Sequence, residues 1–447
     1  MTGWGNVRSL LHRTGRAVIH EEWAGLIEEI SNLPESERQL AIRYIAEDMR
    51  KRPQRWPAHA CGPRQHELRS LAYFKDMAPL IHSIHTGHIT LESHDRLIEQ
   101  LHIPELKIQH LSIDLYSLDA QAVRAIFAAP STRNLRTLHL KGISFYQRAP
   151  SDEVHPLRGL FDLPAGPSIE ELVIHNIEGH DSAILSTVLE QLPSLHTLGI
   201  HGGMYQPERW HHLLQPLQHA RKLRHVDLSR THHSGEAVAQ MATLGILDAL
   251  ESLSTGYNIH ERSLLHLCES LNENLHSLKI TGHAFQRESL KAFGHALFLP
   301  RLERLSVSNP AGVPTVELME SFDELELHRT LKCLELKHME LGPMAMQKLW
   351  TTHEWPLLEH LAIPYNVIQH EGLEHLLAST TPMLRSLDLT WNKLPVEALR
   401  EFARRANVRW SWLRSVALAQ NLDPLTEENR RSIEQSFSRP MMISWRK

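Results

Sequence analysis

The stretch L-R-S-L-D-L-T-W-N at residues 384–392 decides the fold. Leucine occupies positions 1, 4 and 6 of this stretch, and asparagine occupies position 9. Related stretches stand at residues 358–366 and 413–421, which begin 26 residues before and 29 residues after it. A pattern that returns at nearly constant spacing indicates a repeat array, in which each repeat packs on its neighbours.

Thirteen repeats can be aligned with this stretch. In most of them, positions 1, 4 and 6 are leucine or a similar apolar residue. The repeats begin at Ile81, Ile108, Leu135, Ile169, Leu195, Leu223, Leu250, Leu275, Leu302, Leu331, Leu358, Leu384 and Leu413. Their spacing is 25 to 29 residues, apart from a spacing of 34 after Leu135. A regular register of this length predicts that most of the chain is one array.

Each repeat changes its apolar period along its length. Alternation with a period near two marks the start, and helical spacing follows, as in Leu264, Leu267 and Leu271. We therefore predict an α/β fold in which each repeat is a strand followed by a helix. Stacked repeats would form a curved solenoid, a horseshoe with a parallel concave sheet and convex helices.

The pattern L-x-x-L-x-L-x-x-N resembles the leucine-rich repeat family, and the repeat length is similar to its ribonuclease-inhibitor-like class. The resemblance implies that the asparagine at position 9 bonds backbone groups where the strand turns away. Asparagine stands there as Asn258, Asn366, Asn392 and Asn421, and other residues replace it elsewhere. We expect local irregularity over residues 283–340, where this ladder is interrupted.

Different segments flank the array. Residues 1–75 read as a helical N-terminal cap or companion segment, residues 76–422 as the solenoid, and residues 423–447 as a C-terminal cap. Two helices are expected at residues 21–31 and 34–51, the second with Leu40, Tyr44, Ile45 and Met49 on one side. Residues 43–53 and 71–89 also resemble bacterial leucine-rich proteins with a short helical companion segment, which implies a bacterial source.

The long spacing after Leu135 contains four prolines between residues 148 and 168. Proline removes a backbone donor and interrupts helices and strands. We expect a loop that protrudes from the solenoid, either as a contact element or as a tolerated insertion.

Composition excludes several classes of function. The net charge is −5 with histidine neutral, so no basic footprint for nucleic acid is present. No apolar run reaches the roughly 20 residues that span a membrane, and the first residues lack a signal-peptide pattern. Three cysteines form no disulfide framework, which favours a cytoplasmic location. Motifs of phosphate-binding, serine-hydrolase and zinc-protease sites are absent, so we predict no enzyme activity and no cofactor.

Candidate partner-binding residues lie on the concave strands, where positions 3, 5 and 7 face away from the leucines. The late repeats place aromatic residues at position 8, bordered by groups that can hydrogen-bond. Such groupings are typical of protein-binding hot spots. The candidate set is Tyr257, His360, Tyr365, Asp388, Thr390 and Trp391.

The first six repeats each place one histidine on the same face. These residues are His85, His110, His139, His175, His201 and His225. His175 and His201 share a column on neighbouring strands, and Asp227 follows one strand later, so these three are weak candidates for a divalent metal. Histidines that protonate near pH 6 could instead make binding sensitive to pH. The third reading is a histidine-rich composition on an exposed face.

We therefore predict a non-enzymatic module that binds another protein or peptide through the concave face. One alternative is a regulatory sensor whose histidine-lined half binds a metal or responds to pH. Another is a bacterial effector or scaffold that recruits a host or cellular protein through the same face. Fold resemblance does not choose between them, because one fold hosts many functions.

Overall fold

The structure is a computed structural model, which divides into two compact units, Met1–Leu223 and Arg224–Lys447. It describes residues 20–57, 60–61, 77–86, 91–116, 118–142, 156–161, 163–176, 182–202, 207–257, 259–271, 273–282, 292–293, 295–296, 299–308, 316, 319, 326–351, 354–421, 426–438 and 441–445.

The first unit begins with two helices and continues with five strands. The strands are β1 (Ser83–His85), β2 (His110–Asp114), β3 (Thr137–Lys141), β4 (Glu171–His175) and β5 (Thr197–His201). The α-helices are α2 (His20–Ser31), α3 (Glu35–Lys51), α5 (Leu91–Leu101), α6 (Ala120–Ala128), α7 (Ser182–Leu189) and α8 (Pro207–Leu214). The 3-10 turns are η1 (Pro53–Arg55), η4 (Ala78–Leu80), η5 (Pro130–Asn134), η7 (Pro156–Leu160), η8 (Gly166–Ser168) and η10 (Gln215–His219).

The second unit continues the alternation of strand and helix. Its strands are β6 (His225–Asp227), β7 (Ser252–Ser254), β8 (Ser277–Thr281), β9 (Arg304–Ser308), β10 (Cys333–Lys337), β11 (His360–Ala362), β12 (Ser386–Asp388), β13 (Ser415–Ala417) and β14 (Met442–Ser444). Its α-helices are α9 (Ser234–Thr243), α10 (Glu261–Ser270), α13 (Pro343–Thr351), α14 (Gln369–Ala378), α15 (Val396–Arg409) and α16 (Glu427–Ser436). The 3-10 turns are η11 (Leu247–Ala249), η12 (Leu299–Arg301) and η13 (Leu327–Arg329).

Strands pair in parallel and in sequence order, with equal repeat positions facing each other. Leu334 on β10 pairs with Leu361 on β11, which pairs with Leu387 on β12. The side chains of these three residues are at most 2% exposed. Full burial of one such side chain stabilises the fold by roughly 1.5–3 kcal/mol. Columns of leucine at positions 1, 4 and 6 therefore form the core that the repeat predicts.

One pattern of backbone hydrogen bonds recurs between most neighbouring strands. The carbonyl at position 2 accepts hydrogen bonds from two N–H groups of the following strand, as Lys332 O does from Glu359 N at 2.9 Å and His360 N at 3.0 Å. The carbonyl of Cys61 has the same role toward β1, because it accepts from His82 N at 2.7 Å and Ser83 N at 3.1 Å. Cys61 thus stands where a preceding strand would contribute its carbonyl.

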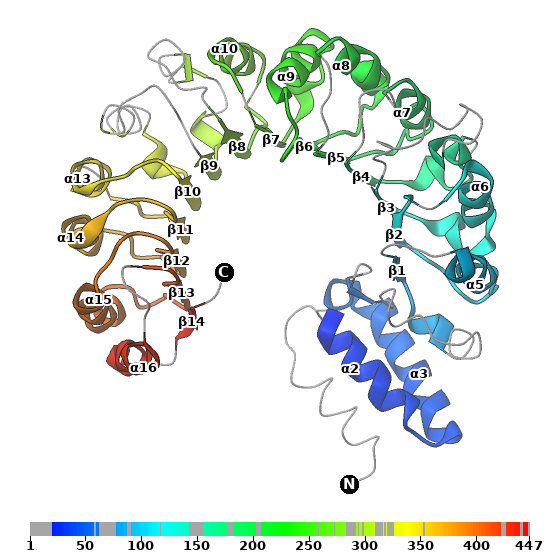
Figure 1. Ribbon diagram of the computed structural model, residues 1–447, viewed down its shortest axis with the longest axis horizontal. Helices are drawn as coiled ribbons and strands as arrows, with labels where there is room; N and C mark the ends of the chain where they lie inside the picture. Colours follow the sequence, from blue (N-terminus) through cyan, green and yellow to red (C-terminus); the bar gives the residue numbers. More distant parts are fainter. Residues whose placement is uncertain are drawn as a thin grey trace. The chain divides into compact units, whose positions relative to one another are not determined.

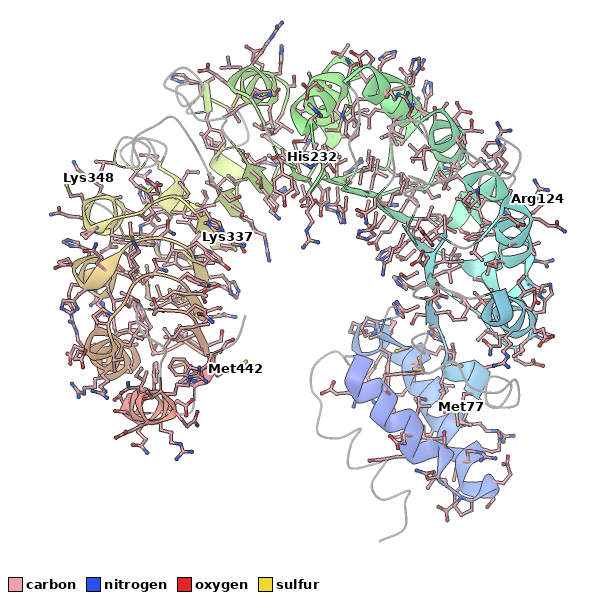
Figure 2. The ribbon with its side chains drawn as sticks, in the orientation of Figure 1. Met77, Arg124, His232, Lys337, Lys348 and Met442 are labelled. Atoms are coloured by element: carbon pink, nitrogen blue, oxygen red, sulfur yellow. The ribbon has the colours of Figure 1, made fainter. Side chains whose placement is uncertain are left out.

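Within each unit, the helices that follow the strands lie along one face of the sheet, whereas α2 and α3 precede β1 (Figure 1). We call the other face, formed by positions 3, 5 and 7, the open face. Figure 2 shows the difference in the second unit, where Lys337 projects from β10 and Lys348 projects from α13 on the opposite side. This arrangement confirms the predicted α/β leucine-rich repeat solenoid with a parallel sheet.

The two predicted N-terminal helices are present, but the predicted apolar face of the second is wrong in part. Leu40 and Tyr44 are 57% and 39% exposed, whereas Ile45 and Met49 are buried. The buried stripe of α3 runs instead through Ala41, Ile42, Ile45, Asp48 and Met49. The prediction used apolar residues alone, so it did not identify a buried face that contains an aspartate.

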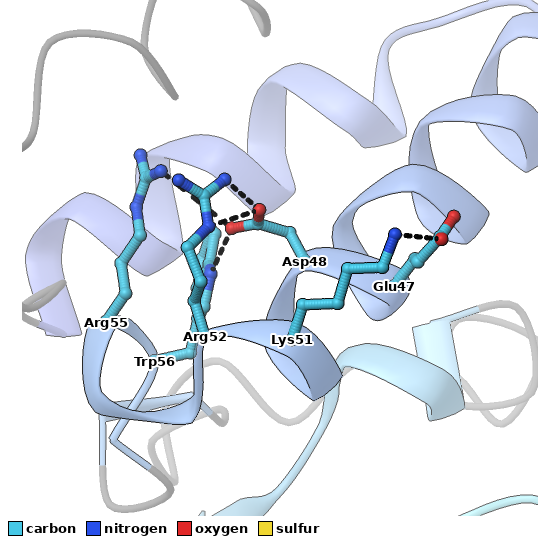
Figure 3. A network of polar contacts seen from close by, with 6 residues as sticks. All are labelled: Glu47, Asp48, Lys51, Arg52, Arg55 and Trp56. Atoms are coloured by element: carbon cyan, nitrogen blue, oxygen red, sulfur yellow. Dashed lines mark hydrogen bonds and ion pairs between the residues drawn. The ribbon is translucent and has the colours of Figure 1, made fainter.

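Asp48 organises the end of α3 (Figure 3). Its carboxylate accepts a hydrogen bond from Trp56 Nε1 at 2.8 Å, pairs with Arg52, and lies 3.8 Å from the Arg55 guanidinium. Burial opposes ionisation of Asp48, but the hydrogen bonds from Trp56 and Arg52 and the charges of Arg52 and Arg55 outweigh it and hold the pKa below its ordinary value. This network closes η1 onto α3.

The predicted protruding loop is wrong for its described part. This part contains η7 (Pro156–Leu160) and η8 (Gly166–Ser168), and Leu157, Leu160 and Leu163 are at most 5% exposed. η7 packs against α6, where a Cβ on Gly159 would meet Ala120 O at 2.5 Å. These residues therefore occupy the helix layer of their repeat as 3-10 turns. Prolines are compatible with such short turns but would interrupt an α-helix. Residues 148–155 of the predicted loop lie outside the described residues.

The C-terminal segment contributes one more strand and one more helix. β14 pairs in parallel with β13, with Ile443 opposite Val416, and α16 packs on α15. Thr426 accepts from Asn429 N and caps the start of α16. Among the described residues, none of the helices combines the length and apolarity that crossing a membrane requires.

Replacing Asp48 by asparagine tests the network of Figure 3. The lowered pKa of Asp48 means that its ionised form stabilises the fold above its unfolded pKa of about 3.9, and that this contribution is lost as pH falls through the lower folded pKa. We expect Asp48→Asn to lower the stability of residues 20–57 by roughly 1–3 kcal/mol at neutral pH, with the difference shrinking below pH ~4. Hydrogen exchange of α3 measures it.

The matched control is Glu47→Gln, because the ion pair of Glu47 with Lys51 is exposed on the same helix. Equal effects of the two substitutions, or an Asp48 effect that persists unchanged in acid, would contradict the prediction.

Candidate functional site

The site begins at position 8, where the chain leaves the strand. Among the described residues, nine repeats have a left-handed backbone at this position. The residues are Gly142, Asn176, Gly202, Arg230, Gly282, His338, Tyr365, Trp391 and Gln420. Glycine and asparagine adopt this conformation readily, whereas it costs other residues roughly 1–2 kcal/mol.

Three consecutive repeats place rings at this strained position and stack them. The rings of His338 and Tyr365 lie 4.1 Å apart at 17°, and those of Tyr365 and Trp391 lie 5.8 Å apart at 15°. Their φ angles are 52°, 58° and 58°. We call these three residues the aromatic rim. Because the strain recurs in adjacent bulky side chains, the rim is a candidate functional feature.

Backbone bonds hold the rim in line. Tyr365 N donates to Thr390 O at 2.9 Å, and Trp391 N donates to Ala419 O at 3.0 Å. Each turn is therefore hydrogen-bonded to the turn of the next repeat. Because these bonds fix the distance between the turns, the rings follow the spacing of the repeats.

The predicted asparagine ladder lies directly behind the rim. Asn366 Oδ1 accepts from Met339 N at 3.0 Å and Leu341 N at 3.1 Å, while its Nδ2 donates to Leu336 O and Ile363 O. Asn421 is buried and bonds in the same way, because its Oδ1 accepts from Asn392 N and Leu394 N and its Nδ2 donates to Leu389 O and Leu418 O. Asn392 is also buried, and its Nδ2 donates to Ile363 O and Thr390 O. The predicted role of asparagine at position 9 is confirmed for these three residues, while Asn258 lies outside the described residues.

The floor beside the rim is made of small side chains. Positions 5 and 7 of β11 to β13 hold Ala362, Pro364, Asp388, Thr390, Ala417 and Ala419. Pro364, Thr390 and Ala419 are buried, and Asp388 is half-buried. Asp388 Oδ1 accepts from Thr390 N at 2.9 Å. The floor is therefore shallow and carries a single carboxylate.

The structure brings together only part of the predicted set. Tyr365, Asp388, Thr390 and Trp391 lie on the adjacent repeats of β11 and β12. His360 is exposed at the opposite end of β11, where it pairs with Cys333. Tyr257 is 44% exposed and lies four repeats before Tyr365, with its ring 5.7 Å from that of His232.

Cys333 and Glu335 mark the neighbouring strand β10. Burial, followed by the charge of Glu335, raises the pKa of the Cys333 thiol. Burial also opposes ionisation of Glu335, but Lys337 at 2.8 Å and Ser306 at 3.0 Å bind its carboxylate and hold its pKa below the ordinary value. Burial raises the pKa of Cys61 and of Cys268 to about 12. None of the three thiols is activated as a thiolate nucleophile.

Three histidines of the first unit form a zigzag on the open face. The ring centroids of His85 and His110 are 4.9 Å apart, and those of His110 and His139 are 4.7 Å apart. His110 is 3% exposed. His139 Nε2 lies 3.4 Å from Glu171 Oε1. We call His85, His110 and His139 the imidazole row.

The weak metal candidates are placed differently. His175 and His201 pair across β4 and β5 with ring centroids 4.8 Å apart, as their shared column predicts. Asp227 belongs to the second unit and stands at position 5 rather than 7, and its Oδ1 accepts from Ser229 N at 2.8 Å. In the part of the chain that the structure describes, no three histidine, cysteine or acidic side chains are grouped to hold a metal ion.

The fold and its open face define a leucine-rich repeat solenoid. No family model matches the chain, and no curated protein matches it. A chain from the yeast complex of Rad7 and Elc1 is similar over 92% of this chain and 98% of that chain, at 15% identity and a TM-score of 0.45. The tropomodulin C-terminal domain of Caenorhabditis elegans is similar over 46% of this chain and 90% of that chain, at 13% identity and a TM-score of 0.23. Likenesses this distant say nothing about what the chain binds.

His338 is the member of the rim that sequence reasoning missed. Its position 8 is visible in the sequence, and the glycines at residues 142, 202 and 282 signal a left-handed backbone at that position. The prediction considered only tyrosine and tryptophan at position 8, so it did not include a histidine at the same position.

Substitutions at Trp391 test whether the rim stores backbone strain. Glycine loses stacking worth about 0.5–1.5 kcal/mol but relieves a left-handed cost of about 1–2 kcal/mol, so we expect a stability within about 1 kcal/mol of the native chain. Valine loses the ring and keeps the strain, so we expect a loss of about 1–3 kcal/mol. Denaturant unfolding followed by circular dichroism compares the two variants.

Trp412 is the matched control, since it is 49% exposed and lies outside the rim, without a left-handed backbone. Glycine should have no advantage over valine at Trp412. A glycine variant of Trp391 as unstable as the valine variant would show that position 8 stores no strain.

Proposed function

We propose that the chain is a non-enzymatic module that binds another protein through the open face of its second unit, with the aromatic rim and its floor as the contact surface. The observation that carries the proposal is the stack of His338, Tyr365 and Trp391 in left-handed conformations. Strain of this kind persists where function selects the side chain.

The chemistry of the rim favours a protein partner. Tyrosine and tryptophan bury large areas at low entropic cost, and Trp391 is 44% exposed before any partner binds. The adjoining floor of alanine, proline and threonine lets a partner approach the rings closely. A carboxylate on this floor and the net charge of −5 disfavour the phosphate backbone of nucleic acids.

Affinity capture from an extract of the source organism tests the proposal. We expect the native chain to retain a partner that a Tyr365→Ala, Trp391→Ala double variant loses, with affinity for the identified partner reduced at least about 30-fold, as for the loss of hot-spot residues. Isothermal calorimetry with the purified partner gives the ratio.

Trp412→Ala is the control, because it removes a comparably exposed ring that lies outside the rim. A partner held equally by the native chain and the folded double variant would exclude the rim as the contact surface. Loss of the partner by both variants would point to a non-specific effect of removing exposed rings.

A second candidate function concerns the first unit, where the imidazole row favours a response to pH. Neighbouring rings of the row have their centroids at most 4.9 Å apart, so protonating all three would place like charges side by side. Glu171 contacts His139, and Asp114 and Lys141 are the other charged side chains on the open face of β2 and β3. Proton binding would then weaken this face or the partner contacts on it.

Hydrogen exchange of β1 to β3 tests this response after correction for the intrinsic effect of pH. We expect exchange to rise at least about threefold between pH 7.5 and roughly pH 5.5 because of repulsion between imidazolium rings, and His110→Gln to reduce the rise. His360→Gln, an exposed histidine of the second unit, is the control. Exchange that is independent of pH, or unchanged by His110→Gln, would remove this candidate.

A further inference from the structure

Asp388 stands at the centre of the floor without a cationic partner. Its one described polar contact is Thr390 N, which donates to Oδ1 at 2.9 Å. Among the described residues, no arginine, lysine or histidine forms an ion pair with it. Glu335, on the same face of the sheet, shows the usual alternative, because its carboxylate is bound by Lys337 and Ser306.

The immediate neighbours of Asp388 leave its carboxylate open to a partner. Ala362 and Ala417 pair with Asp388 on the two adjacent strands, so neither side chain extends past Cβ. Each of these three residues is half-buried. A half-buried carboxylate between two alanines has lost part of its hydration and has gained one hydrogen bond in return. This favours a cationic partner that donates further hydrogen bonds to the carboxylate.

Two rings of the aromatic rim stand in the turns that directly follow β11 and β12. Trp391 follows Asp388 by three residues in the same turn, and its ring stacks offset on that of Tyr365, which leaves part of each face uncovered. Trp391 is 44% exposed. Cations are attracted to the faces of tryptophan and tyrosine, and the aliphatic stems of arginine and lysine pack on such rings.

We propose that Asp388 and the aromatic rim together bind an arginine or lysine side chain presented by an extended segment of the partner protein. The cation pairs with the Asp388 carboxylate while its stem lies against Trp391 and Tyr365. Arginine suits the site best, because its planar guanidinium both stacks on rings and bonds a carboxylate with two N–H groups. This inference rests on the proposed function and names the chemistry of its partner.

Selection from a random dodecapeptide library displayed on phage tests the inference. The native chain is the target, and the Trp391→Ala chain removes peptides that bind elsewhere. We expect the enriched peptides to share an arginine or lysine. Affinity for the best peptide should fall at least about tenfold in Asp388→Asn, which keeps an acceptor for Thr390 N but loses the charge.

Two further variants sharpen the outcome. Glu335→Gln should change the peptide affinity by less than about twofold, because the Glu335 carboxylate is already bound within the chain. Asp388→Lys should reverse the preference and enrich peptides with aspartate or glutamate. Circular dichroism confirms that each variant is folded.

The possible results separate the inference from the proposed function. Peptides that depend on Trp391 but lack basic residues, or that bind Asp388→Asn as well as the native chain, would overturn the inference and leave the rim as a protein-binding surface. A selection that yields no peptide dependent on Trp391 would overturn the inference and count against the rim itself.

Discussion

Every repeat has to satisfy the buried backbone groups at the point where its strand turns toward the helix layer, and the fold depends on that constraint. Asn366 meets it with one side chain that accepts two N–H groups and donates to carbonyls of two repeats. Strand registration, the leucine columns and the line of the aromatic rim all follow from this junction. Leaving such buried donors unpaired would cost roughly 1–3 kcal/mol for each group.

The sequence predicted the parts of the fold that depend on local period. The register of the leucines predicted β1 to β13 but not β14, and the asparagine at position 9 predicted backbone bonds of residues 366, 392 and 421. It failed where tertiary contacts override composition. Residues 156–168 look like an external loop because they contain prolines, yet Leu157 and Leu160 find burial against α6. Asp48 is buried because Arg52 and Trp56 satisfy it, which no apolar period reveals.

The candidate sites show the same division. Side-chain alternation predicted that Asp388 and the six histidines point away from the leucines of their own repeats, and the pairing of His175 with His201 follows from their frames. The stacking of the aromatic rim could not be predicted, because it requires a left-handed backbone in three successive repeats and the ring rotamers that go with it. The imidazole row likewise crosses between positions 3 and 5, a diagonal contact that reading by columns misses.

The position 2 carbonyl, which accepts from two N–H groups of the next strand, has a consequence for how such a chain can change length. A single inserted residue inside a strand moves every later side chain to the opposite face, and it also breaks this pair of bonds. After loss or duplication of a whole repeat, each position 2 carbonyl still faces an equivalent strand that donates the same N–H groups. Recombination between repeats is therefore a route by which the array can lengthen, shorten or exchange its rim side chains while every backbone junction remains satisfied.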